Sequence, residues 1–109
     1  MKRHSDYQCN YGCPVEATLD IIGGKWKGVI LYHLMERTFR FGELKKTMPD
    51  ITQHILTKQL RELEKDGLVN RKVYGEVPPR VEYSLTETGE SLREIIMNIH
   101  SWGSKRFNL

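Results

Sequence analysis

Apolar residues recur three and four positions apart along most of the chain, a spacing that predicts amphipathic helices. Pro14 suits the first position of a helix, while Gly23 and Gly67 are typical of residues that end one. Thr52 or Asp50 supplies the N-cap oxygen of the most strongly patterned helix. The helices expected from this spacing span residues 14–22, 25–36, 42–47, 52–66 and 87–106.

Strict alternation of apolar and polar residues predicts a β-strand over residues 80–85. A partner strand is expected over residues 68–73, with 74–79 as the turn, and residues 39–41 form a short extended piece. Two helices joined by a short turn and followed directly by a hairpin describe a winged helix-turn-helix. The predicted fold is therefore mainly α with a small β-hairpin: a winged helix-turn-helix with extra N- and C-terminal helices.

The helix expected over residues 52–66 carries the clearest functional signal. Its leucines occupy one face, and the opposite face is polar and basic. Residues 51–61 contain no acid, whereas a solvated face usually mixes both charge signs. A helix that enters the major groove of DNA needs hydrogen-bonding groups and cations in its leading turns, without carboxylates that phosphates repel. The residues predicted to contact DNA here are Thr52, Gln53, His54, Thr57, Lys58 and Arg61.

The hairpin adds cations near this helix. Arg71, Lys72 and Arg80 bracket a turn that contains Pro78 and Pro79, which stiffen it and suit contact with a phosphate backbone or a minor groove. Lys72 and Arg80 are therefore also predicted to bind DNA. The alternative is an ordinary solvated turn, with Arg71 in a structural ion pair at the base of the hairpin.

Four runs of sequence carry a family resemblance: GGKW at 23–26, FGEL at 41–44, ILTKQLRELEKDGLVNR at 55–71 and VPPRVEYSLT at 77–86. Together with Cys13-Pro14, they resemble the HxlR-type family of bacterial winged-helix transcription regulators over about residues 13–106. The resemblance implies a cytoplasmic homodimer that binds a palindromic operator in double-stranded DNA and joins the nucleoid when bound. It also implies a regulator, often a repressor, that responds to thiol-reactive effectors.

The chain, residues 1–109, is predicted to form a single domain of the HxlR type. Residues 1–12 are polar and lack periodicity, which indicates a loose N-terminal arm. The helix-turn-helix is expected over residues 42–66, the wing over 68–85 and a dimerisation helix over 87–106.

An apolar stripe on the last predicted helix indicates a partner chain. A helix of about 20 residues would span roughly 30 Å, which is longer than a small winged core can cover. The uncovered stripe therefore favours a two-fold dimer, in which the extra terminal helices serve dimerisation; the alternative is a helix folded back on its own core. The stripe consists of Leu92, Ile95, Ile96, Ile99 and Trp102, with Phe107 just beyond.

Cys13 is a candidate redox sensor. Because it immediately precedes Pro14, it is expected at the N-cap of the first helix, where the positive end of the helix dipole favours a thiolate. The alternative is a small capping residue in a hydrophobic niche, and the family resemblance favours the switch. Cys9 would act as the resolving thiol.

Composition and charge exclude several classes of protein but do not identify a binding partner. A length of 109 residues suits one domain, and 39% hydrophobic with 28% charged residues argues against global disorder. The formal net charge of +3 permits nucleic acid as a partner without requiring it. No apolar run suits a membrane span, and no apolar segment follows the basic start as it would in a signal peptide.

Other functions fit the sequence less well. The four histidines are scattered and no catalytic motif is present, so neither an enzyme nor a cofactor is predicted. A metal site built from His4, Cys9 and Cys13 has too few ligands for a closed zinc site. A winged helix used only for protein contact would expose apolar residues on the recognition face, where only Ile55 lies at the edge.

Overall fold

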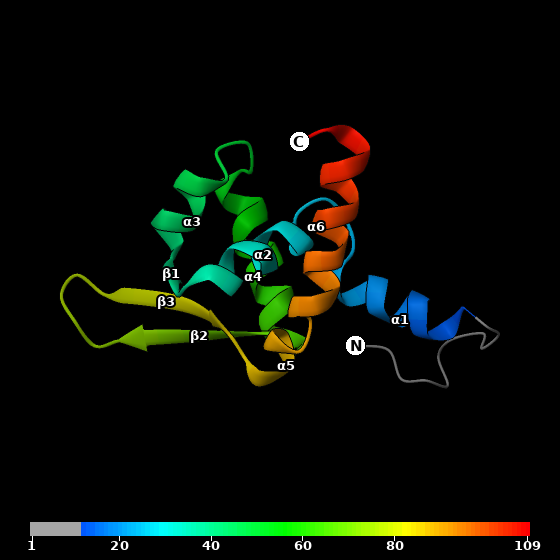
Figure 1. Cartoon of the computed structure of the whole chain (residues 1–109). Helices are drawn as coiled ribbons and strands as arrows, with labels where there is room; N and C mark the ends of the chain where they lie inside the picture. The colour runs from blue at the N-terminus through cyan, green and yellow to red at the C-terminus, as the bar shows by residue number, and fades with distance from the viewer. Residues whose placement is uncertain (1–11) are drawn as a thin grey trace.

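The computed structural model describes residues 12–109, which form six helices and one antiparallel sheet. The hairpin and the first helix extend from opposite sides of a helical core (Figure 1). In chain order the elements are α1 (Cys13–Ile22), α2 (Lys27–Glu36), β1 (Phe39–Arg40), α3 (Phe41–Thr47), α4 (Gln53–Lys65), β2 (Val69–Tyr74), β3 (Arg80–Leu85), α5 (Glu87–Glu90) and α6 (Arg93–Phe107).

The core lies between α2, α3, α4 and the sheet, and the winged helix-turn-helix is confirmed. The leucines of α4 form its centre, because Leu56, Leu60 and Leu63 are all fully buried. Ile30 from α2 and Leu44 from α3 meet them and are equally buried. Burying a side chain of this size stabilises the fold by roughly 1.5–3 kcal/mol, so the leucine face holds α4 in a fixed orientation.

The residue types at both ends of α4 explain where this helix begins and ends. The Thr52 hydroxyl oxygen accepts a hydrogen bond from the Ile55 amide at 3.1 Å, so Thr52 rather than Asp50 is the N-cap. Gly67 adopts a φ of +77°, which glycine tolerates without strain. The Leu68 amide then donates to the Leu63 carbonyl at 2.9 Å and closes a Schellman motif. This bond explains why β2 starts at Val69, one residue later than expected.

The sheet has a third strand that the sequence does not reveal. The strand order is β1-β3-β2, and Phe39 of β1 pairs with Tyr83 while Arg40 pairs with Glu82. A two-residue strand is too short to show alternation, so residues 39–41 could be predicted as extended but not as paired. Phe39 is 3% exposed, so this short strand closes one side of the core.

The first two helices begin at other residues than expected. Gly12, not Cys13, is the N-cap of α1, because the Gly12 carbonyl accepts the Glu16 amide at 2.8 Å. The prediction that Cys13 caps the helix is therefore wrong; Cys13 is the first helical residue and Pro14 the second. In the second helix Trp26 is the N-cap, which delays the start of α2 to Lys27.

The expectation of one continuous helix over residues 87–106 is wrong. The chain forms the short α5, turns at Ser91 and Leu92, and starts again as α6. At this turn the Leu92 amide donates to the Gly89 carbonyl three residues back, so the α-helical ladder tightens and breaks. The break directs Leu92 and Ile96 into the core beside α2. No helix within residues 12–109 is long and apolar enough to cross a membrane.

Candidate nucleic-acid interface

The turn between α3 and α4 is held on both sides. Met48 and Ile51 lie in this turn and are buried, so they anchor it to the core. At the start of α3, a Glu43 carboxylate oxygen accepts the Arg40 amide at 2.8 Å. That backbone hydrogen bond lowers the pKa of Glu43, and the nearby Arg37 guanidinium lowers it further. The carboxylate therefore stays ionised and fixes the entry to the helix-turn-helix.

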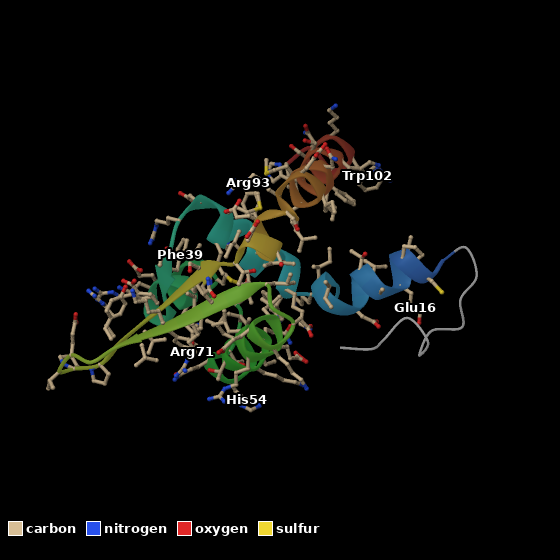
Figure 2. The ribbon with its side chains drawn as sticks, turned by 90° about the horizontal axis from the view of Figure 1, so that it is seen from below. Glu16, Phe39, His54, Arg71, Arg93 and Trp102 are labelled. Atoms are coloured by element: carbon tan, nitrogen blue, oxygen red, sulfur yellow. The ribbon has the colours of Figure 1, made fainter. Side chains whose placement is uncertain are left out.

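The predicted contact residues of α4 lie together on its outer face. Gln53, His54, Lys58 and Arg61 are all exposed, opposite the buried leucines. Figure 2 shows His54 pointing away from the body of the molecule. Among the described residues, no carboxylate lies within 4.0 Å of the Lys58 or Arg61 cations. This face therefore presents cations that are free to bind an external anion.

The two threonines of this region are already hydrogen-bonded within the helix. The Thr52 oxygen accepts the Ile55 amide, which leaves its O–H as a donor for a phosphate. The Thr57 hydroxyl instead donates to the Gln53 carbonyl at 2.9 Å. Its oxygen therefore remains available as an acceptor, which suits the amino groups of adenine or cytosine rather than a phosphate.

The first acid after the acid-free run is directed away from this face. A Glu62 carboxylate oxygen lies 3.6 Å from the Lys27 ammonium of α2, and the Lys27 side chain is only 12% exposed. The pair joins α4 to α2 and keeps the Glu62 charge away from the surface that carries Lys58 and Arg61. The outer face of α4 thus stays positive over its first two turns.

The wing does not bring all of its cations to α4. Lys72 and Arg80 are on the sheet face that carries Tyr74 and Glu82, as the strand register shows. Arg80 is bound within the hairpin, since its guanidinium lies 3.2 Å from a Glu76 oxygen and 3.7 Å from a Glu82 oxygen. The structure therefore separates these two predicted contact residues from the α4 group, and it gives Arg80 carboxylate partners of its own.

Arg71, unlike Lys72 and Arg80, lies beside α4. It belongs to the other face of the sheet and lines a polar hollow of about 210 Å³ with Thr57, Arg61 and Glu64 of α4 and Tyr83 of β3. The structural ion pair considered for Arg71 is absent among the described residues. The signal that places it is its position two residues after the buried Val69, which puts both side chains on one face of β2.

With this geometry established, comparison with known proteins identifies the family. Residues 21–109 match the model of the HxlR-like helix-turn-helix family. The chain belongs to the HxlR family. It is therefore a helix-turn-helix transcriptional regulator, in a family of regulators rather than of enzymes.

Known regulators resemble this chain over most of their length. The regulator YdeP of Bacillus subtilis (strain 168) is 61% identical over 94 residues, which are 86% of this chain and 73% of YdeP. The oxidised form of the redox regulator HypR superposes with a TM-score of 0.83 at 56% identity, covering 85% of this chain and 96% of HypR. The reduced form of YodB from B. subtilis gives a TM-score of 0.75 at 33% identity, covering 91% of this chain and 94% of YodB.

Of the candidate redox and metal-binding residues of this HxlR-family chain, only Cys13 lies within residues 12–109. Cys13 is 5% exposed and carries a free thiol, whereas Cys9 and His4 lie outside the described residues, as do residues 1–11 of the arm predicted for residues 1–12. Among residues 12–109, no group of three or more potential metal ligands occurs.

Two helices of the HxlR-family chain expose apolar side chains next to each other. Val15 and Leu19 on α1 are 62% and 56% exposed, although helical spacing places them in one stripe with the buried Ile22. On α6, Ile95 and Ile99 are exposed as well, and together these residues line an apolar groove of about 310 Å³. Trp102 and Phe107 continue the exposed surface along α6. Of the stripe predicted on the last helix, only Leu92 and Ile96 pack on the chain's own core.

Proposed function

We propose that this HxlR-family regulator is a dimeric repressor that binds a palindromic operator through the outer face of α4. One observation carries the proposal: the exposed residues of α4 up to Arg61 are polar or cationic, and the first carboxylate after them, that of Glu62, lies 3.6 Å from Lys27 of α2. A surface used only for protein contact would expose apolar groups, whereas Ile55 packs partly against the core. DNA binding places the regulator on the nucleoid, in the cytoplasm of a bacterium.

The test of this proposal is selection of duplexes from a random pool by the purified protein. Enrichment of one inverted repeat with half-sites about one helical turn apart supports both DNA reading and two-fold symmetry. Equal retention of all sequences would overturn sequence-specific binding. Enrichment of a single half-site would overturn the palindromic mode alone.

Arg61→Ala and Gln53→Ala are each expected to weaken binding to the selected duplex by about 1–3 kcal/mol, because Arg and Gln make bidentate contacts with guanine and adenine edges. Fluorescence anisotropy on the selected duplex and on single-base variants measures the loss. The binding preference at one base pair should relax in each variant. Lys105→Ala on α6 removes an exposed cation far from α4 and serves as the control; an equal loss there would contradict base reading by Arg61.

The homodimer is supported by the apolar groove between α1 and α6. Exposed leucine, isoleucine and tryptophan side chains on adjoining helices form a surface of the kind that a second copy covers. A two-fold axis is the commonest arrangement for such a surface, since the same patch then serves both chains. The dimer would set two copies of α4 against successive turns of the DNA.

We also propose that Cys13 is the thiol switch of this regulator. Its thiol is buried at the first residue of α1, the helix that carries Val15 and Leu19 of the proposed dimer surface. Similarity to HypR, a redox regulator, supports the proposal. A disulfide of Cys13 with Cys9 or with a second chain would displace the start of α1 and so alter the spacing of the α4 helices.

Diamide treatment is expected to change the affinity of the parent protein for the selected duplex at least about tenfold and to leave Cys13→Ser unchanged. The diazene takes up two electrons and two protons from a pair of thiols, so a disulfide accompanies the change. Anisotropy titrations and the mass of non-reduced peptides measure both. An unchanged parent, or an equal response in Cys13→Ser, would exclude Cys13 as the sensor; Cys9→Ser separates the roles of the two cysteines.

A further inference from the structure

The two faces of the wing have different surroundings. Residues opposite each other in the hairpin share a face, so Lys72 and Tyr74 lie with Glu82 and Arg80. Arg71 lies on the reverse face, opposite Tyr83. In Figure 2, Arg71 lies on the same side of the molecule as His54 of α4. The wing therefore presents Arg71 on the face beside α4, and Lys72, Tyr74, Arg80 and Glu82 on the face away from α4.

On the face away from α4, Arg80 is held by three neighbours. Its Nη2 lies 3.2 Å from a Glu76 oxygen, and its Nε is buried and lies 3.7 Å from a Glu82 oxygen. The guanidinium carbon lies 3.9 Å from the centre of the Tyr74 ring, whose hydroxyl donates to Glu82 at 2.9 Å. Glu76 and Arg80 lie at opposite ends of the turn, so their ion pair closes it.

Arg80 has little charge left for a phosphate, because its positive charge faces the negative charges of Glu76 and Glu82. Lys72 lies opposite Glu82 and 4.8 Å from the Tyr74 ring, without an ion pair within 4.0 Å among the described residues. A phosphate that approached Arg80 would have to displace two carboxylates and the aromatic ring. The Arg80 side chain is only 27% exposed.

Arg71 has the opposite properties. It is exposed and has no carboxylate within 4.0 Å among residues 12–109. Arg61 of α4 lines the same hollow and is equally unpaired. Glu64 also lines this hollow, but its carboxylate forms no ion pair within 4.0 Å with either arginine. Two guanidinium groups without an ion pair, on the helix proposed to enter the groove and on the adjoining strand, suit a phosphate at the edge of that groove.

We propose that Arg71 is the wing cation that binds a DNA phosphate, and that Arg80 is a positioning residue that fixes the turn of the wing. This inference rests on the proposed function, since it assigns the contacts of the same DNA-binding surface. It replaces the expectation that Arg80 contacts DNA, and it attributes the role of Arg80 to the packing of Tyr74, Glu76 and Glu82.

The test compares two matched variants, Arg71→Gln and Arg80→Gln, each of which removes one positive charge from the wing. Affinity for the selected duplex is measured over a series of KCl concentrations, and chymotryptic cleavage after Tyr74 reports the order of the turn. Arg71→Gln is expected to weaken binding roughly tenfold and to leave cleavage unchanged. The slope of the logarithm of the binding constant against the logarithm of the KCl concentration should become shallower by about one. Arg80→Gln is expected to keep the salt dependence and to accelerate cleavage.

Lysine variants separate charge from geometry. Arg71→Lys should keep the salt dependence of the parent, because a phosphate contact needs only the charge. Arg80→Lys should still accelerate cleavage, because lysine lacks the planar group that stacks on Tyr74 and reaches two carboxylates.

A reduced salt dependence in Arg80→Gln would overturn the inference, and so would a parental salt dependence in Arg71→Gln. If the parent protein binds no duplex at all, the proposed function fails and this inference with it. Parental binding with an unaffected Arg71→Gln overturns the inference alone.

Discussion

Gly89→Ala is expected to destabilise the protein by about 3 kcal/mol or more, at the upper end of what overpacking a core costs. A Cβ at residue 89 would lie 2.2 Å from the Leu68 carbonyl oxygen and 3.2 Å from a Leu85 methyl group. The carbonyl cannot move aside cheaply, because it accepts the Thr86 amide at 3.1 Å. The Thr86 hydroxyl also donates to the Gly67 carbonyl at 2.6 Å and accepts the Gly89 amide at 2.9 Å.

Thermal unfolding followed by circular dichroism measures the effect, and a loss of this size lowers Tm by roughly 10–20 °C in a domain of this length. Gly42→Ala is the control, because a Cβ there meets no atom within 4 Å and residue 42 is also helical. It should change the free energy of unfolding by less than about 1 kcal/mol. If the Tm of Gly89→Ala equalled that of the Gly42→Ala control, the close approach of α5 to the residue before β2 would be contradicted.

Ile99→Glu is expected to convert the proposed dimer into a monomer and to weaken operator binding at least about 100-fold, because two linked half-sites gain that much or more over one. Ile99 is 58% exposed and lines both the groove shared with α1 and a second apolar hollow beside α2. A carboxylate at residue 99 should change the stability of the monomer little, because this position is exposed there. In the dimer the same carboxylate would be buried without a partner.

Light scattering after size exclusion gives the mass, and anisotropy on the selected duplex gives the affinity. Ser101→Glu introduces the same charge two residues later on the opposite side of α6, where residue 101 is exposed and contributes to neither hollow. That control should remain dimeric and bind as the parent does. Equal masses for the two variants would contradict a dimer interface at the α1–α6 groove.

Most of the helix-turn-helix could be predicted from the sequence because its signals are local. The leucine spacing of α4, the Thr52 cap and the glycine at residue 67 each act within a few residues, and the structure places all three as expected. The acid-free run of residues 51–61 likewise predicts a polar and cationic exposed face on α4. The alternation over residues 80–85 predicts β3 with its correct bounds.

The broken last helix and the third strand were missed because distant residues decide them. No pattern within residues 86–106 reveals that Gly89 packs on the Leu68 carbonyl, so the break between α5 and α6 could not be predicted. The pairing of Phe39 with Tyr83 joins residues far apart in the sequence and leaves no periodic signal in a two-residue strand.

The sequence by itself determined which residues of α4 face outward and that residues 53–61 of this helix carry no acid, because helical periodicity is a short-range property. Only the tertiary structure decided which of the two wing arginines is paired with carboxylates. Whether an arginine is paired depends on strand register and on the turn, which bring Glu76 and Glu82 to Arg80 and leave Arg71 beside Arg61. Two arginines in one hairpin thus acquire different surroundings, because a shift of one position along a strand moves a side chain to the opposite face of the sheet.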